Sequence, residues 1–181
     1  LILEFIIKQL TILVGDSGVG KTSLLVQFDQ GKFIPGSFSA TVGIAHTVSH
    51  HLTPLLFYFF CAALLLLYDI TSKTSFDNIR AWLTEIHEYA QSDVVIMLLG
   101  NKADMSGGRV IKREDGERLA REHGVIFMET SAKTGINVDL AFMTVAKELI
   151  GRSVEPPTDP KFQIHEMTET KTRETSCCGL T

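Results

Sequence analysis

A glycine-rich run that contains one lysine and one threonine carries the clearest chemistry in this sequence. It reads Gly15-Asp16-Ser17-Gly18-Val19-Gly20-Lys21-Thr22. Glycines let the chain wrap closely around a phosphate, so that successive backbone N–H groups point inward at the anion. Lys21 would bring a mobile positive charge to the outer phosphates, and Thr22 would offer a hydroxyl ligand to Mg²⁺. The pattern therefore predicts a phosphate-binding loop.

The segments on either side of this loop support that interpretation. The apolar run 10–14 predicts a strand that enters the loop, and residues 23–28 predict the first turns of a helix that leaves it. The positive end of the helix dipole would then lie beneath the bound anion. The alternative, an ordinary glycine-rich turn, does not require a strand before it and a helix after it.

Two further polar motifs follow apolar runs in the same way. Asn101-Lys102-Ala103-Asp104 comes after the run 94–99, and Ser131-Ala132-Lys133 comes shortly after the run 125–128. The carboxyl ends of parallel strands lie at one edge of a sheet, which is where such sheets bind their ligands. We therefore expect the phosphate-binding loop and both motifs to meet at one edge.

The elements that must position these motifs alternate between strands and helices. The buried central strand is expected in the second half of the run 61–69. A helix capped by Ser75 is expected to bury a stripe of Phe76, Ile79, Leu83, Ile86 and Tyr89, with Trp82 at its margin. Another helix is expected at 112–123, ending at Gly124. The last is expected from an Asn137 cap to about Arg152, burying Leu140, Ala141, Val145, Leu149 and Ile150. This alternation predicts a mainly parallel α/β sheet with right-handed crossovers.

Length and composition fit a single folded domain at residues 1–152 and a polar tail at 153–181. The chain has 181 residues, 45% of them hydrophobic, with a net charge of −4 and a pI near 5.9, which argues against nucleic-acid binding. Three cysteines do not indicate a disulfide framework, and Cys61 is expected to be a buried apolar thiol. The first residue is Leu1, and we expect the sequence to be a fragment.

Taken together, these motifs resemble those of the small GTPases, specifically the secretory-vesicle members of the Rab branch. The resemblance covers about residues 10–44 and 62–152 and the terminal cysteine pair. It implies the three-layer fold of P-loop nucleotide hydrolases, GTP or GDP with Mg²⁺ as the bound cofactors, a monomer, and hydrolysis of GTP to GDP. Lys21 would stabilise charge on the phosphates during that reaction.

The resemblance also implies a role for each motif residue. Asp104 would accept hydrogen bonds from guanine N1–H and N2–H2, an arrangement that adenine lacks. The stem of Lys102 and the ring of Phe33 would flank the base and ribose, and the Ala132 N–H would meet guanine O6. Thr41, in Thr-Val-Gly-Ile, would join Thr22 on Mg²⁺ when the γ-phosphate is present. The implied nucleotide-binding set is Ser17, Gly18, Val19, Gly20, Lys21, Thr22, Ser23, Phe33, Thr41, Asn101, Lys102, Asp104, Ser131, Ala132 and Lys133.

Cys177 and Cys178, near the end of the tail, resemble the double geranylgeranylation site of the Rab family; an incidental cysteine pair is the alternative. The tail has no polybasic stretch, so stable anchoring would need two lipid chains. The resemblance implies prenylation and escort factors, exchange and activating proteins, and effectors as partners. It also implies a location on the cytoplasmic face of secretory vesicles, or other intracellular membranes, with a soluble pool.

One segment departs from the family pattern. Between Thr41 and Asp69 the family has two antiparallel strands, an Asp-x-x-Gly motif with a catalytic glutamine, and the switch II helix, whereas here no such motif occurs. Residues 45–61 are too short for those elements, so we expect a sheet incomplete at its second and third strands. We expect hydrolysis and effector binding to be impaired as a result.

Residues 45–61 admit several explanations. The run Leu-Leu-Phe-Tyr-Phe-Phe-Cys-Ala resembles a translated splice-acceptor tract, which indicates a gene-model error or splice variant; a genuine apolar insert along the first strand is the alternative. A metal site at His46, His50 and His51 is a weaker interpretation, and so is a membrane span over the uncharged run 55–68, which is short for crossing a bilayer. Two other functions remain open for the whole chain: a lipid-tailed remnant that binds partners without switching, and an ATP-dependent phosphotransferase, which the guanine motifs disfavour.

Overall fold

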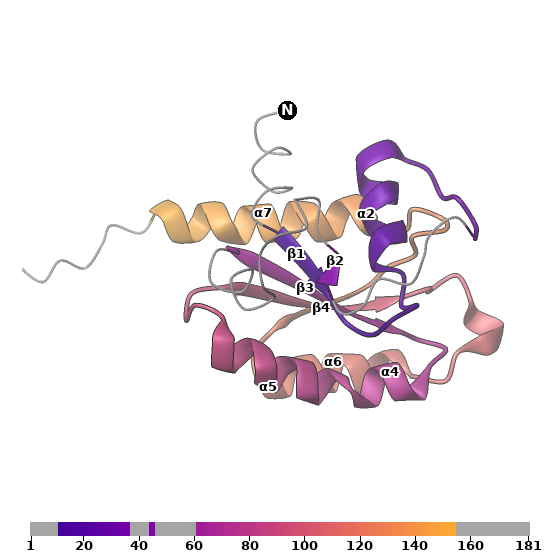
Figure 1. The fold of residues 1–181 in the computed structure, drawn as a ribbon, viewed down its shortest axis with the longest axis horizontal. Coiled ribbons are helices and arrows are strands. Elements are labelled where there is room, and N and C mark those ends of the chain that lie inside the picture. The colour runs from indigo at the N-terminus through magenta and orange to yellow at the C-terminus, as the bar shows by residue number, and fades with distance from the viewer. Residues whose placement is uncertain (1–10, 37–43, 46–60, 155–181) are drawn as a thin grey trace, which may run out of the picture.

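The computed structural model describes residues 11–36, 44–45 and 61–154, and these form a sheet covered by helices on both faces (Figure 1). The order of the sheet is β2-β1-β3-β4-β5. The elements are β1 (Thr11–Val14), α2 (Lys21–Gln30), β2 (Ile44–Ala45), β3 (Ala63–Asp69), α4 (Lys73–Asp77), α5 (Ile79–Tyr89), β4 (Val95–Asn101), a 3-10 turn η1 (Ser106–Gly108), α6 (Arg113–His123), β5 (Ile126–Glu129) and α7 (Val138–Val154).

The sheet is mainly parallel, as the alternation of strands and helices predicts. β1 pairs with β3, β3 with β4 and β4 with β5, all in parallel. The short strand β2 pairs antiparallel with β1, matching Val14 with Ile44. Of the segment 45–61, which the sequence marks as atypical, the structure describes only Ala45 and Cys61. The expected gap in the sheet beyond β2 therefore lies outside the described residues.

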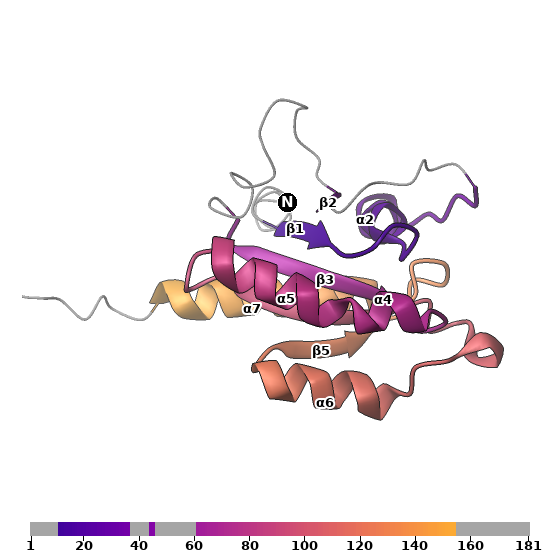
Figure 2. The same ribbon diagram turned by 60° about the horizontal axis from the view of Figure 1, so that its bottom comes forward.

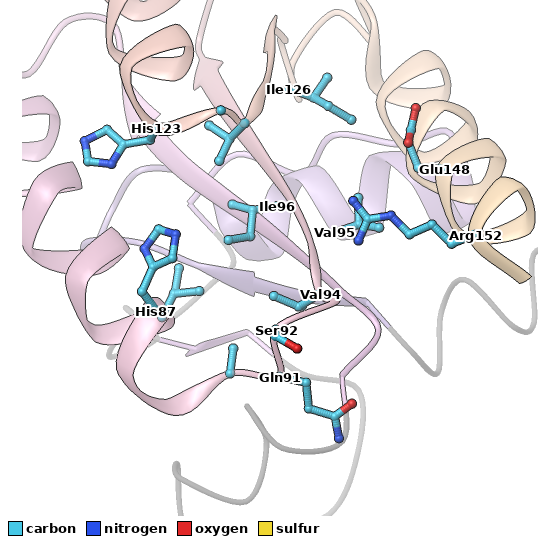
Figure 3. Close-up of a pocket in the computed structure, with 14 residues that line it drawn as sticks. His87, Gln91, Ser92, Val94, Val95, Ile96, His123, Ile126, Glu148 and Arg152 are labelled. Carbon is cyan, nitrogen blue, oxygen red and sulfur yellow. The ribbon is translucent and has the colours of Figure 1, made fainter. Parts of the chain in front are cut away.

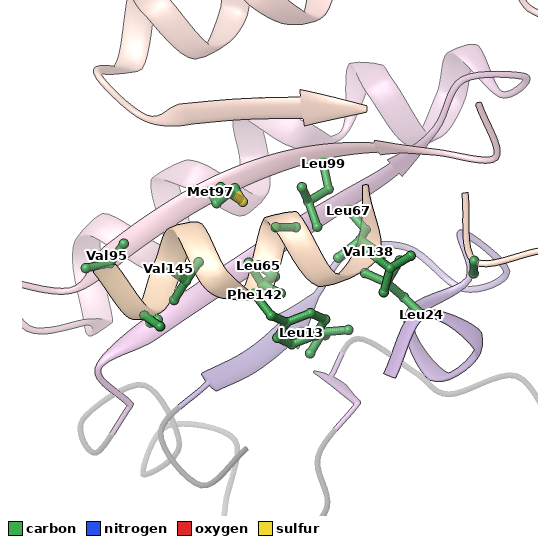
Figure 4. Close-up of a cluster of buried hydrophobic side chains, with 14 of the residues drawn as sticks. Leu13, Leu24, Leu65, Leu67, Val95, Met97, Leu99, Val138, Phe142 and Val145 are labelled. Atoms are coloured by element: carbon green, nitrogen blue, oxygen red, sulfur yellow. The ribbon is translucent and has the colours of Figure 1, made fainter. Parts of the chain in front are cut away.

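Successive side chains along each strand point to opposite faces of the sheet, and this creates two separate hydrophobic cores. Leu13, Leu65 and Leu67 face α2 and α7, whereas Ile12, Leu64 and Leu66 face the layer formed by α4, α5 and α6. Figures 1 and 2 show these two helical layers on opposite sides of the sheet. Figure 4 shows the first core, including the Phe142 ring of α7. That ring also stacks on Phe28 of α2 at a centroid distance of 3.9 Å. Every residue of β3 is buried, as expected for a central strand.

Two expectations about the helices are wrong. Ser72, rather than Ser75, caps α4, because its hydroxyl accepts a hydrogen bond from the Ser75 N–H at 3.3 Å. Ser75 is buried inside α4, where its hydroxyl accepts a hydrogen bond from the Asp69 N–H at 3.0 Å. The helix also divides at Asn78 into α4 and α5, with the expected stripe of Ile79, Leu83 and Ile86 buried on α5.

The buried face of α7 is also rotated from the expected one. Leu140 and Ile150 are about half exposed, whereas Phe142 and Ala146 are buried alongside Ala141 and Val145. The apolar residues of α7 fit more than one helical phase, and contact with the sheet and α2 selects the phase that buries the phenylalanine ring. Among the described residues, no helix combines the length and hydropathy that a membrane crossing requires.

Candidate functional site

The phosphate-binding loop connects β1 to α2 with a backbone that only glycine adopts easily. Gly15 has φ +133° and lies so close to the Leu67 carbonyl oxygen that a Cβ would overlap it. Gly20 has φ +101° and directly precedes α2, and a Cβ there would overlap the side-chain amide of Asn101. Gly18 has φ +78°, but a Cβ there would meet no atom within 4 Å. Two glycines thus allow close packing, whereas Gly18 borders open space.

Lys21 is folded back onto the loop that it follows. Its Nζ donates hydrogen bonds to the carbonyl oxygens of Gly15 at 2.8 Å and Asp16 at 2.7 Å. The side chain is buried, and this desolvation lowers the pKa of Lys21 although the nearby Asp16 carboxylate acts in the opposite direction. A buried ammonium with carbonyl partners retains a third N–H for an anion such as a phosphate.

Asn101 connects all three motifs. Its Nδ2 donates to the Val19 carbonyl of the phosphate-binding loop at 2.8 Å. Its Oδ1 accepts from the Ala132 N–H at 3.2 Å and from the Thr130 hydroxyl at 3.3 Å. The ends of β1, β4 and β5 are therefore joined at one edge of the sheet, which is the convergence that we expected. The sequence marked Asn101 as part of a motif but did not indicate this bridging role.

Asp104 and Ser131 form the next contact at this edge. The Ser131 hydroxyl donates to Asp104 Oδ1 at 2.6 Å and accepts from the Thr134 N–H at 3.1 Å. Lys133 Nζ lies 4.0 Å from Asp104 Oδ2. The Asp104 carboxylate is thus fixed through one oxygen by a neutral hydroxyl, and Lys133 approaches the other.

Lys102 forms an ion pair that sequence reasoning missed. Its Nζ lies 2.6 Å from Asp69 Oδ2 at the end of β3, and its backbone has φ +66°. Asp69 Oδ1 accepts hydrogen bonds from the Thr71 N–H at 2.8 Å and the Thr71 hydroxyl at 2.7 Å. Burial opposes ionisation of Asp69, but the Lys102 and Thr71 contacts outweigh it and hold the pKa below its usual range. The signal was available, since a carboxylate that ends a buried strand needs a partner.

A cavity of about 300 Å³ opens among these residues. Phe33, about one-third exposed, contributes to its wall, and so does Met105, which the sequence analysis did not include. Val19 is buried in the core instead, and Thr41, Cys177 and Cys178 lie outside the described residues, as do the three histidines. The cavity is lined by Gly18, Gly20, Ser23, Phe33, Asn101, Lys102, Asp104, Met105, Ala132 and Lys133.

Comparison with known proteins agrees with this arrangement. The model of the Ras family matches residues 10–53 and 50–151. The chain belongs to the Ras family. It is 56% identical to the Ras-related protein Rab-37 of Mus musculus, over 93% of this chain and 85% of the relative. It is 52% identical to the human Ras-related protein Rab-26, over 92% of this chain and 73% of the relative.

A more distant relative extends the same similarity. The Ras-related protein Rab-8B of Dictyostelium discoideum is 36% identical, over 97% of this chain and 94% of the relative. Together these relatives identify a Rab-type small GTPase of vesicle traffic, as the motifs indicated. The three-layer α/β fold described above is the small G protein fold. At the level of this family, guanine nucleotide and Mg²⁺ are the bound cofactors.

Proposed function

We propose that this protein binds GDP or GTP in the 300 Å³ cavity and acts as a Rab-type switch on secretory vesicles. The observation that carries the proposal is the bridging position of Asn101, which ties the phosphate-binding loop to the segment after β5. This bridge brings a phosphate-binding backbone and the Asp104 carboxylate to one cavity. A nucleotide with two N–H donors on its base fits that combination.

Selection of guanine would depend on Asp104. One of its oxygens accepts from Ser131, and the carboxylate retains acceptor capacity for the N1–H and N2–H2 groups of guanine. Adenine lacks this pair of donors, and its binding would leave the remaining acceptor capacity of the Asp104 carboxylate unused. The Ala132 N–H would be shared between Asn101 Oδ1 and guanine O6. Phe33 and the stem of Lys102 would border the base and ribose.

The phosphates would lie over the glycine-rich loop and the first turn of α2. Lys21 already uses two N–H groups on the loop carbonyls, so its third would reach a phosphate oxygen and stabilise charge there. Thr22, together with Thr41, would hold Mg²⁺, which neutralises phosphate charge when it is bound. Among the described residues no group of three or more His, Cys, Asp or Glu side chains could hold a metal, so the phosphates themselves would complete the site.

We also propose that this chain hydrolyses GTP far more slowly than its relatives. No Asp-x-x-Gly motif with a following glutamine occurs between Thr41 and Asp69, so nothing in that segment would orient an attacking water. The alignment with mouse Rab-37 extends over 195 positions and is longer than the chain itself, which supports missing residues. The family match also divides at residues 50–53. Single-turnover hydrolysis at the rate of an intact Rab protein would contradict this proposal.

The tail carries the remaining part of the proposal. Lipid chains on Cys177 and Cys178 would hold the protein on the cytoplasmic face of vesicle membranes after delivery by prenylation and escort factors. Exchange and activating proteins would act on the nucleotide site. Replacing Cys178 by serine should release the protein from membranes in cells, because one lipid chain gives only marginal binding. Retention of the C178S protein on vesicles would contradict the two-chain anchor.

A second candidate is a lipid-tailed protein that binds partners without a nucleotide cycle, which the missing glutamine motif favours. Thermal unfolding with GDP, GTP or ATP, each with Mg²⁺, separates the possibilities. We expect the unfolding temperature to rise with GDP and GTP and not with ATP. No shift with any nucleotide would favour the non-switching protein, and a larger shift with ATP would indicate a phosphotransferase.

A further inference from the structure

The carboxylate of Asp16, inside the phosphate-binding loop, is held by side chains from the helical layer formed by α4, α5 and α6. The Trp82 Nε1–H of α5 donates to Asp16 Oδ1 at 2.9 Å. The Asn78 Nδ2–H, at the junction of α4 and α5, donates to Asp16 Oδ2 at 2.7 Å. Both carboxylate oxygens thus have a donor that lies more than sixty residues away in the sequence.

The same residue holds Lys21 through its backbone. The Asp16 carbonyl oxygen accepts from Lys21 Nζ at 2.7 Å, while the Asp16 carboxylate faces Asn78 and Trp82. A rotation of Asp16 would therefore move the carbonyl that fixes the lysine ammonium. Hydrogen bonds to a carboxylate are stronger than neutral ones, so two of them are a substantial constraint on the loop.

We propose that Trp82 and Asn78 are positioning residues for nucleotide phosphates, acting through Asp16 to hold the phosphate-binding loop and Lys21 in their binding geometry. The inference rests on the proposed nucleotide site and goes beyond it. It assigns a role in phosphate binding to α5, an element that lines none of the described nucleotide cavity. Trp82 would accordingly influence affinity for the diphosphate group and not for the guanine base.

The competing explanation is that Trp82 only fills space. Its ring is partly buried and packs against the core beneath the sheet, so its removal would destabilise the fold in any case. Trp82→Phe separates these roles, since phenylalanine retains an aromatic ring but has no N–H group. Asn78→Ala provides a second variant at an exposed position whose side chain makes no capping hydrogen bond to α5. Arg80→Ala is the matched control, because Arg80 lies on the same helix as Trp82 but pairs with Glu122 on α6.

The decisive measurement is the affinity of each variant for GDP and for guanosine, which carries the same base and ribose without phosphates. We expect W82F to raise the dissociation constant of GDP about tenfold, the effect of losing one hydrogen bond to a charged group. N78A should raise it by a smaller factor, and R80A should leave it unchanged. The guanosine dissociation constant should stay within about twofold in all three variants. Equal losses for GDP and guanosine, or an unchanged GDP affinity in W82F, would overturn the proposal.

A double variant tests whether Trp82 acts through Asp16. D16A should weaken GDP binding at least as much as W82F, and adding W82F to D16A should cause little further loss. If the fold losses of GDP affinity from D16A and W82F instead multiplied in the double variant, the proposal would be overturned. If the wild-type protein bound neither GDP nor guanosine, the proposed function would fail and this inference with it. If guanosine bound normally and W82F had no effect on GDP, only the inference would fail.

The protein supplies its own reporter for this contact. Trp82 is the only tryptophan in the chain, and its indole N–H bonds directly to the phosphate-binding loop. GDP should therefore change the intrinsic tryptophan emission, and guanosine should not. D16A should abolish the GDP-dependent change at saturating nucleotide. An equal emission change with guanosine, or its persistence in D16A, would contradict the proposed contact.

Discussion

Two cavities lie at opposite ends of the same parallel strands, and they differ in how their polar side chains are held. At the carboxyl ends, Asn101, Asp104 and Lys102 each have a defined side-chain or backbone partner. At the amino ends, a cavity of about 370 Å³ is larger but contains no residue of the three motifs (Figure 3). The larger of these two cavities is therefore the one that contains none of the motif residues.

The amino-end cavity shows which contacts occur in a space between helices and strands that contains none of the three motifs. It lies between the ends of α5, α6 and α7 and the starts of β4 and β5. His87 bonds to the Leu83 carbonyl one turn back on α5, and Arg152 of α7 donates to the Asp93 carbonyl in the turn before β4. At the carboxyl end, Asn101 instead joins three segments at once, and Asp104 and Lys102 each pair with a side chain of a further segment. Such fixed polar groups, rather than empty space, distinguish a binding site.

The largest effect should come from breaking the bridge at the carboxyl end. Asn101→Ala leaves the Val19 carbonyl, the Ala132 N–H and the Thr130 hydroxyl without their partner, each in a buried setting. We expect a loss of about 2–4 kcal/mol in the free energy of unfolding and the loss of measurable GDP binding. Urea unfolding and GDP titration would measure both. Ser92→Ala, in the amino-end cavity, is the control, and equal losses in both variants would remove the distinction between the two ends.

A second prediction concerns the reactivity of the Cys61 thiol, which precedes β3 at the amino end of the sheet. Burial raises the pKa of its thiol to about 11, so very little reactive thiolate is present at pH 8. In a C177S/C178S variant, an aromatic disulfide reagent should label the folded protein about a hundred times more slowly than the urea-unfolded protein. Rapid labelling under native conditions would show that the amino end opens easily.

The Asp69–Lys102 pair should make the carboxyl end sensitive to acid. The pKa of Asp69 is lower in the folded than in the unfolded protein, so the stability it contributes is complete above about pH 5, where even the unfolded-state carboxyl is ionised. That contribution is lost as pH falls through the folded-state pKa. We expect Asp69→Asn to reduce the free energy of unfolding by about 1–3 kcal/mol near neutral pH. The difference from wild type should shrink below about pH 4, and a difference independent of pH would contradict the ion pair.

The smallest effects are expected in the amino-end cavity. His87→Ala and His123→Ala should change the free energy of unfolding by about 0.5 kcal/mol or less, because neither side chain is buried. GDP affinity should remain within about twofold of wild type. A large loss of GDP affinity in either variant would show that the two ends are energetically coupled, which their separate contacts do not predict.

Local patterns were sufficient to predict most of the elements. The buried strand β3, the glycine stop after α6 and the stripe on α5 follow from hydropathy and capping, which act within a few residues. Local patterns did not predict which face of α7 is buried. Leu140 and Phe142 are both apolar, and only contact with the rest of the fold decides which of them is buried. The Ser72 cap was missed because two serines three residues apart offer the same capping chemistry.

By itself, the sequence determined the three polar motifs and the end of the sheet at which they lie, because the order of strands and loops fixes which loops share an edge. The partners of those motifs were decided by the tertiary structure. Asn101 reaches Val19 and Ala132, Lys102 pairs with Asp69, and Asp16 accepts hydrogen bonds from Asn78 and Trp82. Each of these contacts joins residues far apart in the chain. Their distance depends on the packing of whole layers, which no local pattern encodes.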